Sequence, residues 1–324
     1  MTAILQGDAL TVLRERFADE SVQCCVTSPP YWGLRDYHVL GQLGLEPTPE
    51  EYVTNLVDVF REVRRVLKPD GTLWLNLGDS YAGSGKGRNA DGTRTDFSGL
   101  SGASGGCIDG VQPIYKNIAG LKPKDLVGIP WRVAFALQAD GWYLRSDIIW
   151  HKPNSMPESV TDRPTKAHEY LFLLSKRERY YYDAEAIAEP MNFPERRYNP
   201  DTAQQKCSKV GTRLQGGLHD GRERYGNPDI GRNKRSVWTI ATQPYLGAHF
   251  ATFPEALVEP CILAGCPVGG LVLDPFAGSG TTIAVAQRLW RCGVGIELNA
   301  DYVALAEART AQQGFILEAN DEPR

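Results

Sequence analysis

A glycine-rich turn between an apolar run and a helical pattern constrains this chain more than any other feature. The apolar residues 271–273 precede Asp274-Pro275-Phe276-Ala277-Gly278-Ser279-Gly280-Thr281-Thr282, and apolar residues at helical spacing follow over 283–289. Glycines in such a turn permit positive φ and a close approach of backbone to a ligand. The first turn of the following helix carries free N–H groups. The pattern therefore predicts a parallel strand whose carboxyl end binds a nucleotide-like ligand.

A second motif, Thr27-Ser28-Pro29-Pro30-Tyr31-Trp32, also follows an apolar run, at residues 22–26. Consecutive prolines hold the chain extended and donate no hydrogen bonds, so their carbonyls can accept. A hydroxyl, a carbonyl and an aromatic ring then suit a planar group that bears an amino group. Alone, the tetrapeptide fits equally well a turn with a tyrosine in the core. The glycine motif in the same chain favours the ligand-binding interpretation.

These two motifs resemble those of the DNA amino-methyltransferases. The segment 27–31 looks like their catalytic motif, and 274–280 looks like their S-adenosyl-L-methionine motif. The catalytic motif comes first by roughly 245 residues, which is the circularly permuted order of the β class. The resemblance extends from residue 4 to about 308. It is weakest over 183–235 and in the glycine-rich stretch after Tyr81.

The alternation of apolar strands and amphipathic helices agrees with the fold that the resemblance implies. We expect an α/β, doubly wound, mostly parallel seven-stranded Rossmann-like sheet with an antiparallel hairpin edge and an appended target-recognition region. The hairpin is predicted from 168–174 and 179–182. Residues 1–183 would form the catalytic half, with a mobile loop at 82–120. Residues 184–235 would recognise the target, and 236–324 would form the cofactor-binding half.

The predicted catalytic residues are Ser28, Pro29, Pro30 and Tyr31. The Ser28 Oγ and the Pro29 carbonyl would accept hydrogen bonds from an exocyclic amino group, whose lone pair would then point at the sulfonium methyl group. Transfer would be direct, without a covalent enzyme intermediate. The base would leave the duplex and stack on Tyr31, with Trp32 supporting or sharing that role.

Glu297 follows the strand 293–296 and lies 23 residues after Asp274, close to the spacing of about 20 at which an acidic residue holds ribose hydroxyls in dinucleotide folds. By resemblance, Asp8 lies near the adenine, and 249–254 walls the methionine; a packing role for His249 and Phe250 stays open. The predicted cofactor-binding residues are Asp8, Thr27, His249, Phe250, Phe253, Pro254, Asp274, Phe276, Gly278, Ser279, Gly280, Thr281 and Glu297.

The charge is polarised, although the chain carries a net charge of −4. Residues 196–235 hold ten Lys/Arg against four acids, or +6, whereas 241–324 hold four arginines against nine acids, or −5. Such polarity is expected where one region faces phosphates, and a solvated basic loop is the alternative. Residues 82–110 contain nine glycines and form either a passive loop or an arm that closes on DNA. The predicted DNA contacts are Lys86, Arg88, Arg222, Arg224, Arg232 and Lys234.

The target base is cytosine N4 in preference to adenine N6, because the resemblance associates serine before Pro-Pro-Tyr with cytosine. A hydroxyl can serve either base, so adenine stays open. A catalytically silent DNA-binding protein and a methyltransferase for RNA or protein glutamine are further alternatives. Carbon-5 methylation is disfavoured, because no Pro-Cys occurs in a matching context. We interpret His168-Glu169 and Gly78-Asp79 as structural, since no partner for Glu169 is visible in the sequence.

The composition argues against a metal site and against a membrane span. The seven cysteines are odd in number and form no CxxC pair, so we expect reduced thiols and no metal site. No apolar stretch approaches about 20 residues and no basic-then-apolar leader opens the chain, so we expect a cytoplasmic protein without a membrane span. Duplex DNA is the expected partner, and the resemblance also allows a homodimer and a cognate restriction endonuclease.

Overall fold

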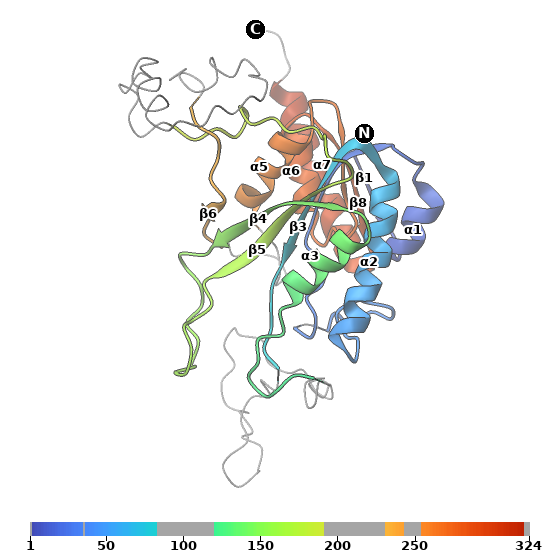
Figure 1. Ribbon diagram of the computed structural model, residues 1–324. Helices are drawn as coiled ribbons and strands as arrows, with labels where there is room; N and C mark the ends of the chain where they lie inside the picture. Colours follow the sequence, from blue (N-terminus) through green and yellow to red (C-terminus); the bar gives the residue numbers. More distant parts are fainter. Residues whose placement is uncertain (1, 35, 83–119, 191–230, 243–253, 321–324) are drawn as a thin grey trace, which may run out of the picture. The chain divides into compact units, whose positions relative to one another are not determined.

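The computed structural model describes residues 2–34, 36–82, 120–190, 231–242 and 254–320, with side chains as far as 311 (Figure 1). The His249, Phe250, Phe253, Lys86, Arg88, Arg222 and Arg224 sites and nearly all of the 82–120 loop lie outside these residues. The chain divides into two compact units, 1–181 with 236–324, and 182–235.

The strands are β1 (Thr2–Gln6), β2 (Val22–Thr27), β3 (Leu67–Leu77), β4 (Tyr143–His151), β5 (His168–Ser175), β6 (Val237–Thr239), β7 (Leu271–Asp274) and β8 (Cys292–Glu297). The helices are α1 (Ala9–Arg16), α2 (Pro49–Val66), α3 (Ile129–Ala139), α5 (Glu255–Gly265), α6 (Thr281–Arg288) and α7 (Ala300–Asn320).

The strands form one mixed sheet in the order β1-β8-β7-β2-β3-β5-β4-β6. The pairs from β1 to β3 are parallel, whereas β5 is antiparallel to both β3 and β4. This sheet confirms the predicted fold class, but it has eight strands within the described residues instead of seven. The extra strand is β6, which pairs in parallel with β4 and forms the edge.

The predicted hairpin is wrong in its second strand. Residues 179–182 form no strand, and 168–175 pair instead with β3 and β4. Leu173 of β5 opposes Trp74 on one side and Ser146 on the other. The apolar residues of β5 are therefore buried between two strands, which its local sequence cannot specify.

Helix α2 illustrates how local sequence places an element. Thr48 Oγ1 accepts a hydrogen bond from the Glu51 N–H at 3.2 Å, and Pro49 occupies the first helical position, where a missing N–H costs nothing. Apolar residues at three- and four-residue spacings then bury one face of the helix. The sequence predicts this helix, and the structure confirms it.

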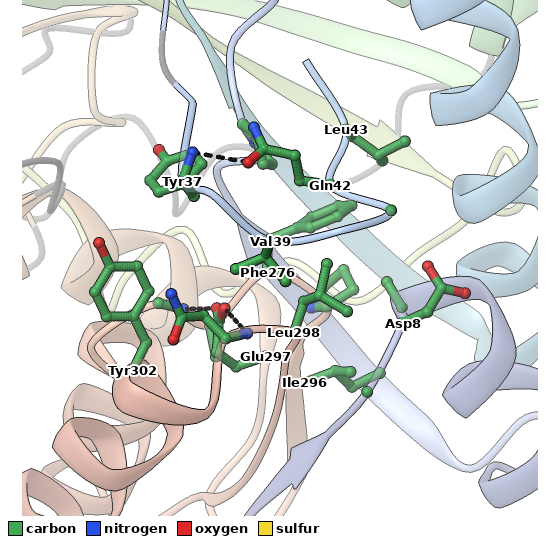
Figure 2. Close-up of a pocket in the computed structure, with 18 of the residues that line it drawn as sticks. Asp8, Tyr37, Val39, Gln42, Leu43, Phe276, Ile296, Glu297, Leu298 and Tyr302 are labelled. Carbon is green, nitrogen blue, oxygen red and sulfur yellow. Dashed lines mark hydrogen bonds between the residues drawn. The ribbon is translucent and has the colours of Figure 1, made fainter. Parts of the chain in front are cut away.

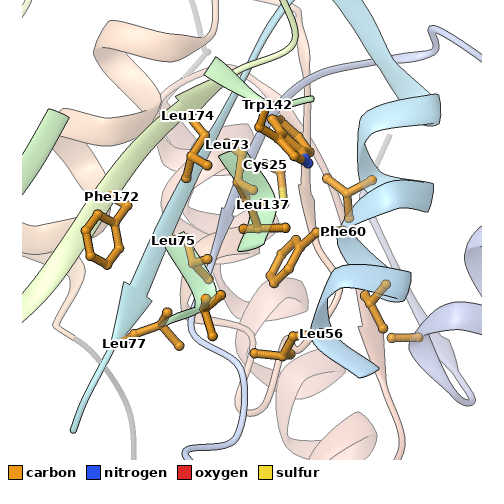
Figure 3. Close-up of a cluster of buried hydrophobic side chains, with 14 of the residues drawn as sticks. Cys25, Leu56, Phe60, Leu73, Leu75, Leu77, Leu137, Trp142, Phe172 and Leu174 are labelled. Carbon is orange, nitrogen blue, oxygen red and sulfur yellow. The ribbon is translucent and has the colours of Figure 1, made fainter. Parts of the chain in front are cut away.

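Two helical layers cover the sheet. Helices α1, α2 and α3 contact one another in a row, as do α5, α6 and α7 (Figure 1). Leu73, Leu75 and Leu77 alternate along β3 and pack with Leu56 and Phe60 of α2 in the main core (Figure 3). The intervening side chains of β3 face the other layer, because successive strand residues point to opposite faces.

Helix α5 packs closely against that second face. A Cβ on Gly265 of α5 would lie 2.7 Å from Thr72 Oγ1 and from Trp74 Nε1, so only glycine allows this approach. Asn76, two residues after Trp74, is buried on the same side of β3 near its carboxyl end. The strand thereby delivers one amide side chain to the edge where the predicted motifs meet.

The direction of the strands decides which residues share that edge. The carboxyl ends of β1, β8, β7, β2, β3 and β4 lie at one edge of the sheet. Because β5 is antiparallel, its amino end, with His168 and Glu169, lies at the same edge. Asp8, Ser28 and Glu297, which follow or end three of the parallel strands, therefore lie at the same end of the sheet as Glu169.

In the unit 182–235, the described residues are 182–190 and 231–235. Glu189 and Arg232 exchange two backbone hydrogen bonds, each of 2.8 Å. The Glu189 carboxylate also pairs with Arg232 at 3.3 Å and with Arg235 at 2.9 Å. These contacts join residue 189 to residues 232 and 235 within this unit. Over the described part of the chain, no helix is long and apolar enough to cross a membrane.

Candidate active site

A cavity that opens to solvent, with about 890 Å³ of space including solvent at its mouth, lies at the carboxyl ends of β1, β8, β7 and β2 (Figure 2). It is lined by the turns after β1, β2 and β7, the end of β8 and a segment at 37–43. Eight residues that the sequence predicts for the site line it: Asp8, Ser28, Pro30, Phe276, Gly278, Ser279, Thr281 and Glu297. The cavity therefore joins the two motifs, as the strand order requires.

Glu297 is held by two backbone N–H groups at the floor of this cavity. Its Oε2 accepts from Gly278 at 2.8 Å, and its Oε1 accepts from Asn299 at 2.8 Å, which fixes the carboxylate plane (Figure 2). Burial raises the pKa of the Glu297 carboxyl, and the backbone donors oppose that shift. Each oxygen keeps a second lone pair, so the carboxylate can accept from two vicinal hydroxyl groups.

Gly278 and Gly280 have different roles. Gly278 has a φ of 51°, lines the cavity and offers its N–H to Glu297. Gly280 has a φ of 77° and does not line the cavity, and a Cβ there would lie 2.9 Å from the Ala306 Cβ. The second glycine therefore serves the packing of α7 against the turn and not the approach of a ligand.

Asp274 and Thr27 also lie beneath the cavity and not on its wall. The Asp274 Oδ1 accepts from Thr27 Oγ1 at 2.6 Å and from the Phe276 N–H at 3.0 Å. Asp274 is fully buried, and burial raises the pKa of its carboxyl to about 6 against the hydrogen bond from Thr27. This carboxylate ties the strand that carries the catalytic motif to the strand that carries the glycine motif.

Asp8 and Pro254 act at helix starts. The Asp8 Oδ1 accepts from the Thr11 N–H at 2.9 Å and from Thr11 Oγ1 at 2.8 Å, so it caps α1 while it lines the cavity. Pro254 is buried at the N-cap of α5 and does not line the cavity. The placement of Pro254 is thus that of a structural residue.

The segment 37–43 and Tyr302 form a wall that the sequence does not reveal. Tyr37, Val39, Gln42 and Leu43 line the cavity, and Gln42 Oε1 accepts from the Tyr37 N–H at 2.7 Å (Figure 2). The rings of Tyr37 and Tyr302 meet edge to face, with centroids 6.3 Å apart. The sequence signal for this wall is the position of residues 37–43 alone, since they closely follow the catalytic motif.

The catalytic motif ends in a buried polar cluster. Tyr31 Oη donates to Glu169 Oε2 at 2.7 Å and accepts from Asn76 Nδ2 at 2.7 Å, and Ser28 Oγ lies 3.3 Å from Tyr31 Oη. Burial, with Glu169 beside it, raises the pKa of the Tyr31 phenol well above 10. The ring needs Gly78, where a Cβ would lie 2.4 Å from the Tyr31 ring. The sequence offered no partner for Glu169, and the structure shows it in contact with this motif.

The two prolines differ in what their carbonyls contact. Tyr52 Oη donates to the Pro30 carbonyl at 2.7 Å, whereas no described residue donates a hydrogen bond to the Pro29 carbonyl. Trp32 is buried in the core, and its Nε1 donates to the Glu46 carbonyl at 2.9 Å. The prediction that Trp32 shares the stacking role is therefore wrong, and a supporting role from within the core stays a prediction. Of the two proline carbonyls, that of Pro29 is therefore the one that no described residue occupies.

The structure also places Asp79, Arg232 and Lys234, three further residues considered in the sequence analysis. Asp79 Oδ1 accepts from the N–H groups of Gly128 and Ile129 at 3.0 Å each, so it caps the start of α3 and is structural, as predicted. Arg232 is paired with Glu189 in the unit 182–235, which also contains Lys234. Among the residues that the structure describes, no group of three or more His, Cys, Asp and Glu could hold a metal ion.

The doubly wound sheet and the cavity that joins its two motifs are those of a Rossmann-like methyltransferase. Residues 22–308 match the N6 and N4 methyltransferase family described as DNA methylase, and the chain belongs to this family. It is therefore a DNA amino-methyltransferase whose cofactor is S-adenosyl-L-methionine. The cavity fits that cofactor, because Glu297 presents two free lone pairs beside the apolar Phe276 and the half-buried Gly278, which lines the cavity without a side chain.

Known relatives extend over nearly the whole chain. It is 49% identical over 306 residues to the Type II methyltransferase M.SmaI of Serratia marcescens, which covers 94% of this chain and 89% of the relative. It is 48% identical over 306 residues to M.Cfr9I of Citrobacter freundii, with 94% and 86% covered. Among solved structures, the PvuII DNA methyltransferase, cytosine-N4-specific, superposes with a TM-score of 0.61 at 20% identity, covering 98% and 93%. A DNA modification methylase of Thermus thermophilus gives 0.57 at 24%, covering 97% and 96%. Both show the same fold.

Proposed function

We propose that this protein methylates the exocyclic amino group of a base flipped out of duplex DNA, and that the base is cytosine. The observation that supports this most is the position of Ser28. Its side chain belongs to the motif cluster with Tyr31 and also lines the cavity that holds Glu297. An amino group bound at Ser28 would therefore lie beside the cofactor site.

S-adenosyl-L-methionine supplies an electrophilic sulfonium methyl group when bound. The Glu297 carboxylate would accept from the ribose hydroxyls, Phe276 would contact the adenine, and the Gly278 turn would let the cofactor approach the backbone. Asp8, at the end of β1, would lie on the adenine side. These residues bind and orient the donor and move no proton.

Ser28 and Pro29 would hold the acceptor nitrogen. An exocyclic amino nitrogen is a poor nucleophile, because its lone pair is delocalised into the ring. Acceptors at the Ser28 Oγ and the Pro29 carbonyl would bind its two N–H bonds, draw the nitrogen toward tetrahedral geometry and aim its lone pair at the methyl group. As the nitrogen bonds to the methyl carbon, the methyl–sulfur bond would break and S-adenosyl-L-homocysteine would leave, and the methylated nitrogen would then release one proton to water. The rate enhancement would come from positioning and electrostatics, with no covalent enzyme intermediate.

Cytosine is favoured because the resemblance associates serine before Pro-Pro-Tyr with cytosine. Adenine N6 is the second candidate, because the Ser28 hydroxyl can accept from the amino group of either base. One solved structure with this fold is named cytosine-N4-specific, which agrees with the preference. Residues 184–235, with their excess of basic side chains, would recognise the target sequence. Relatives named Type II methyltransferases support a restriction endonuclease of the same specificity as a partner.

The decisive experiment identifies the methylated nucleoside. Plasmid DNA is incubated with the protein and radiolabelled S-adenosyl-L-methionine, digested to nucleosides and separated by chromatography. Label in N4-methylcytosine is the expected result. Label in N6-methyladenine would select the second candidate, and label in 5-methylcytosine or none in DNA would contradict the proposal. Ser28→Ala, which keeps the cofactor cavity, is the matched control and should lose most of the transfer rate.

A further inference from the structure

Glu169 and Lys152 form a mostly buried ion pair behind the catalytic motif. Glu169 belongs to the start of β5 and Lys152 follows the end of β4, and their side chains are 16% and 18% exposed. The Lys152 Nζ contacts Glu169 Oε1 and lies 4.2 Å from the centre of the Trp150 ring. Lys152 thereby leaves Glu169 Oε2 to accept from Tyr31 of the motif and from Asn76.

The charge on Glu169 decides which way the hydroxyl groups point. An ionised carboxylate can only accept, so the Tyr31 hydroxyl must donate to Oε2 across the 2.7 Å contact. Burial raises the pKa of Tyr31, so the phenol keeps that proton. Asn76 Nδ2 donates to Tyr31 Oη at 2.7 Å and to Glu169 Oε2 at 3.0 Å. Tyr31 is thus held as a donor to Glu169 and as an acceptor toward everything else.

The next group in this series of hydrogen bonds is Ser28. With its own proton directed to Glu169, Tyr31 Oη can only accept from Ser28 Oγ, 3.3 Å away. The Ser28 proton is then directed to Tyr31, and one of the two lone pairs on Ser28 Oγ lies toward Asn76 Nδ2, 3.3 Å away. The other lone pair remains to accept from a group in the cavity that Ser28 lines. A hydroxyl in this orientation accepts from an amino group, and it would be badly matched to a carbonyl oxygen.

We propose that the Lys152–Glu169 pair orients the Tyr31 and Ser28 hydroxyls so that Ser28 acts as an acceptor toward the target base. Glu169 is then a positioning and specificity residue, which selects an amino group over a carbonyl group without touching the base. The inference rests on the proposed function and deepens it. Cytosine and adenine carry an amino donor where their deaminated forms, uracil and hypoxanthine, carry a carbonyl acceptor.

Glu169→Gln tests the direction of the hydrogen bonds with little change of shape. The amide can donate to Tyr31 Oη, which releases the tyrosine proton toward Ser28 and the serine proton toward the base. We expect single-turnover methyl transfer to fall by about tenfold or more, with cofactor affinity unchanged. Glu178→Gln, an exposed glutamate beyond the end of β5, is the matched control and should keep the parent rate.

Binding of deaminated DNA separates orientation from simple structural support. Duplexes containing the site that the parent protein methylates are compared with duplexes whose target base is replaced by its deaminated form. The measured quantity is the ratio of the two dissociation constants, which cancels effects common to both duplexes. Glu169→Gln should shrink the preference for the amino base by about tenfold. A merely structural role would weaken both duplexes alike and leave the ratio unchanged.

Tyr31→Phe provides an independent variant should Glu169→Gln fold poorly. It keeps the ring against Gly78 but cuts the chain of hydroxyl groups, so it should also shrink the amino preference. Adding Glu169→Gln to Tyr31→Phe should cost little more, because the connection is already lost. If the parent protein methylates DNA and neither variant changes rate or preference, the inference is overturned. If the parent protein transfers no label to DNA, it is the proposed function that fails.

Discussion

The buried carboxylate of Asp274 should make the folded state less stable as the pH rises. Its side chain is fully buried, and its Oδ2 has no hydrogen-bond partner among the described residues. Burial raises its pKa from 3.8 to about 6 in the folded protein, against the opposing hydrogen bond from Thr27. The folded state therefore binds a proton more tightly than the unfolded state does, and stability falls as that proton is lost.

The expected magnitude follows from the size of that shift. A difference between 3.8 and about 6 corresponds to about 3 kcal/mol at 1.36 kcal/mol per pKa unit. The loss accumulates mainly between about pH 4 and pH 6 and is complete above the folded pKa. Asp274→Asn keeps an acceptor for Thr27 and the Phe276 N–H but cannot ionise. Relative to the parent, this variant should gain about 3 kcal/mol in unfolding free energy between acidic and neutral pH.

Urea unfolding of both proteins at pH values from 4 to 8 measures this difference, with linear extrapolation at each pH. Asp301→Asn, which removes an exposed carboxylate from the first turn of α7, controls for the loss of one negative charge. A parent-minus-variant difference that stays constant with pH would refute the reasoning. It would mean that the Asp274 carboxylate is solvated or compensated in the folded state.

Three further predictions concern the cofactor cavity, the packing of α7 and the basic residues within 196–235. Glu297→Ala should weaken S-adenosyl-L-methionine binding several-fold or more in calorimetric titration, because it removes both acceptors at the cavity floor; unchanged affinity would remove Glu297 from the ribose role. Gly280→Ala should cost about 1–3 kcal/mol in unfolding free energy, because its Cβ would meet Ala306 at 2.9 Å in a left-handed conformation. Replacing basic residues within 196–235 should lower DNA affinity and its salt dependence while sparing the cofactor, and equal DNA binding at moderate salt would contradict the recognition role.

Much of the cofactor cavity could be predicted from the sequence, because its residues follow strands whose local signals are strong. The glycine turn, the acidic residue 23 positions later and the end of the first strand each come from a βα unit. Parallel strands bring their carboxyl ends to one edge whatever their order in the chain. The structure places Gly278, Glu297 and Asp8 together at the cavity wall. It also moves Asp274 beneath that wall, since a carboxylate next to a glycine turn can bind the turn's own N–H groups instead of a ligand.

Glu169 could not be assigned from the sequence, because its position depends on a choice of strand partner. A short apolar run such as residues 170–174 predicts a strand but not its neighbours, and the nearest segment, 179–182, suggested a hairpin. Insertion of β5 between β3 and β4 reverses its direction relative to the parallel strands. Glu169, at the start of β5, therefore reaches the same edge as residues that end the other strands. The role of residues 37–43 as a cavity wall could not be predicted for a related reason. A segment without apolar periodicity acquires its position only from tertiary contacts.

The permuted order of the two motifs has no cost in this architecture, because the contacts that join them are made across the sheet. Strand β2 lies between β7 and β3, so the catalytic motif is adjacent to the glycine turn on one side and to Asn76 on the other. The Thr27–Asp274 hydrogen bond of 2.6 Å connects residues 247 positions apart. Breaking the chain at a different loop would leave this pairing and the cavity unchanged. The site is thus defined by strand adjacency, and chain order only decides which motif is synthesised first.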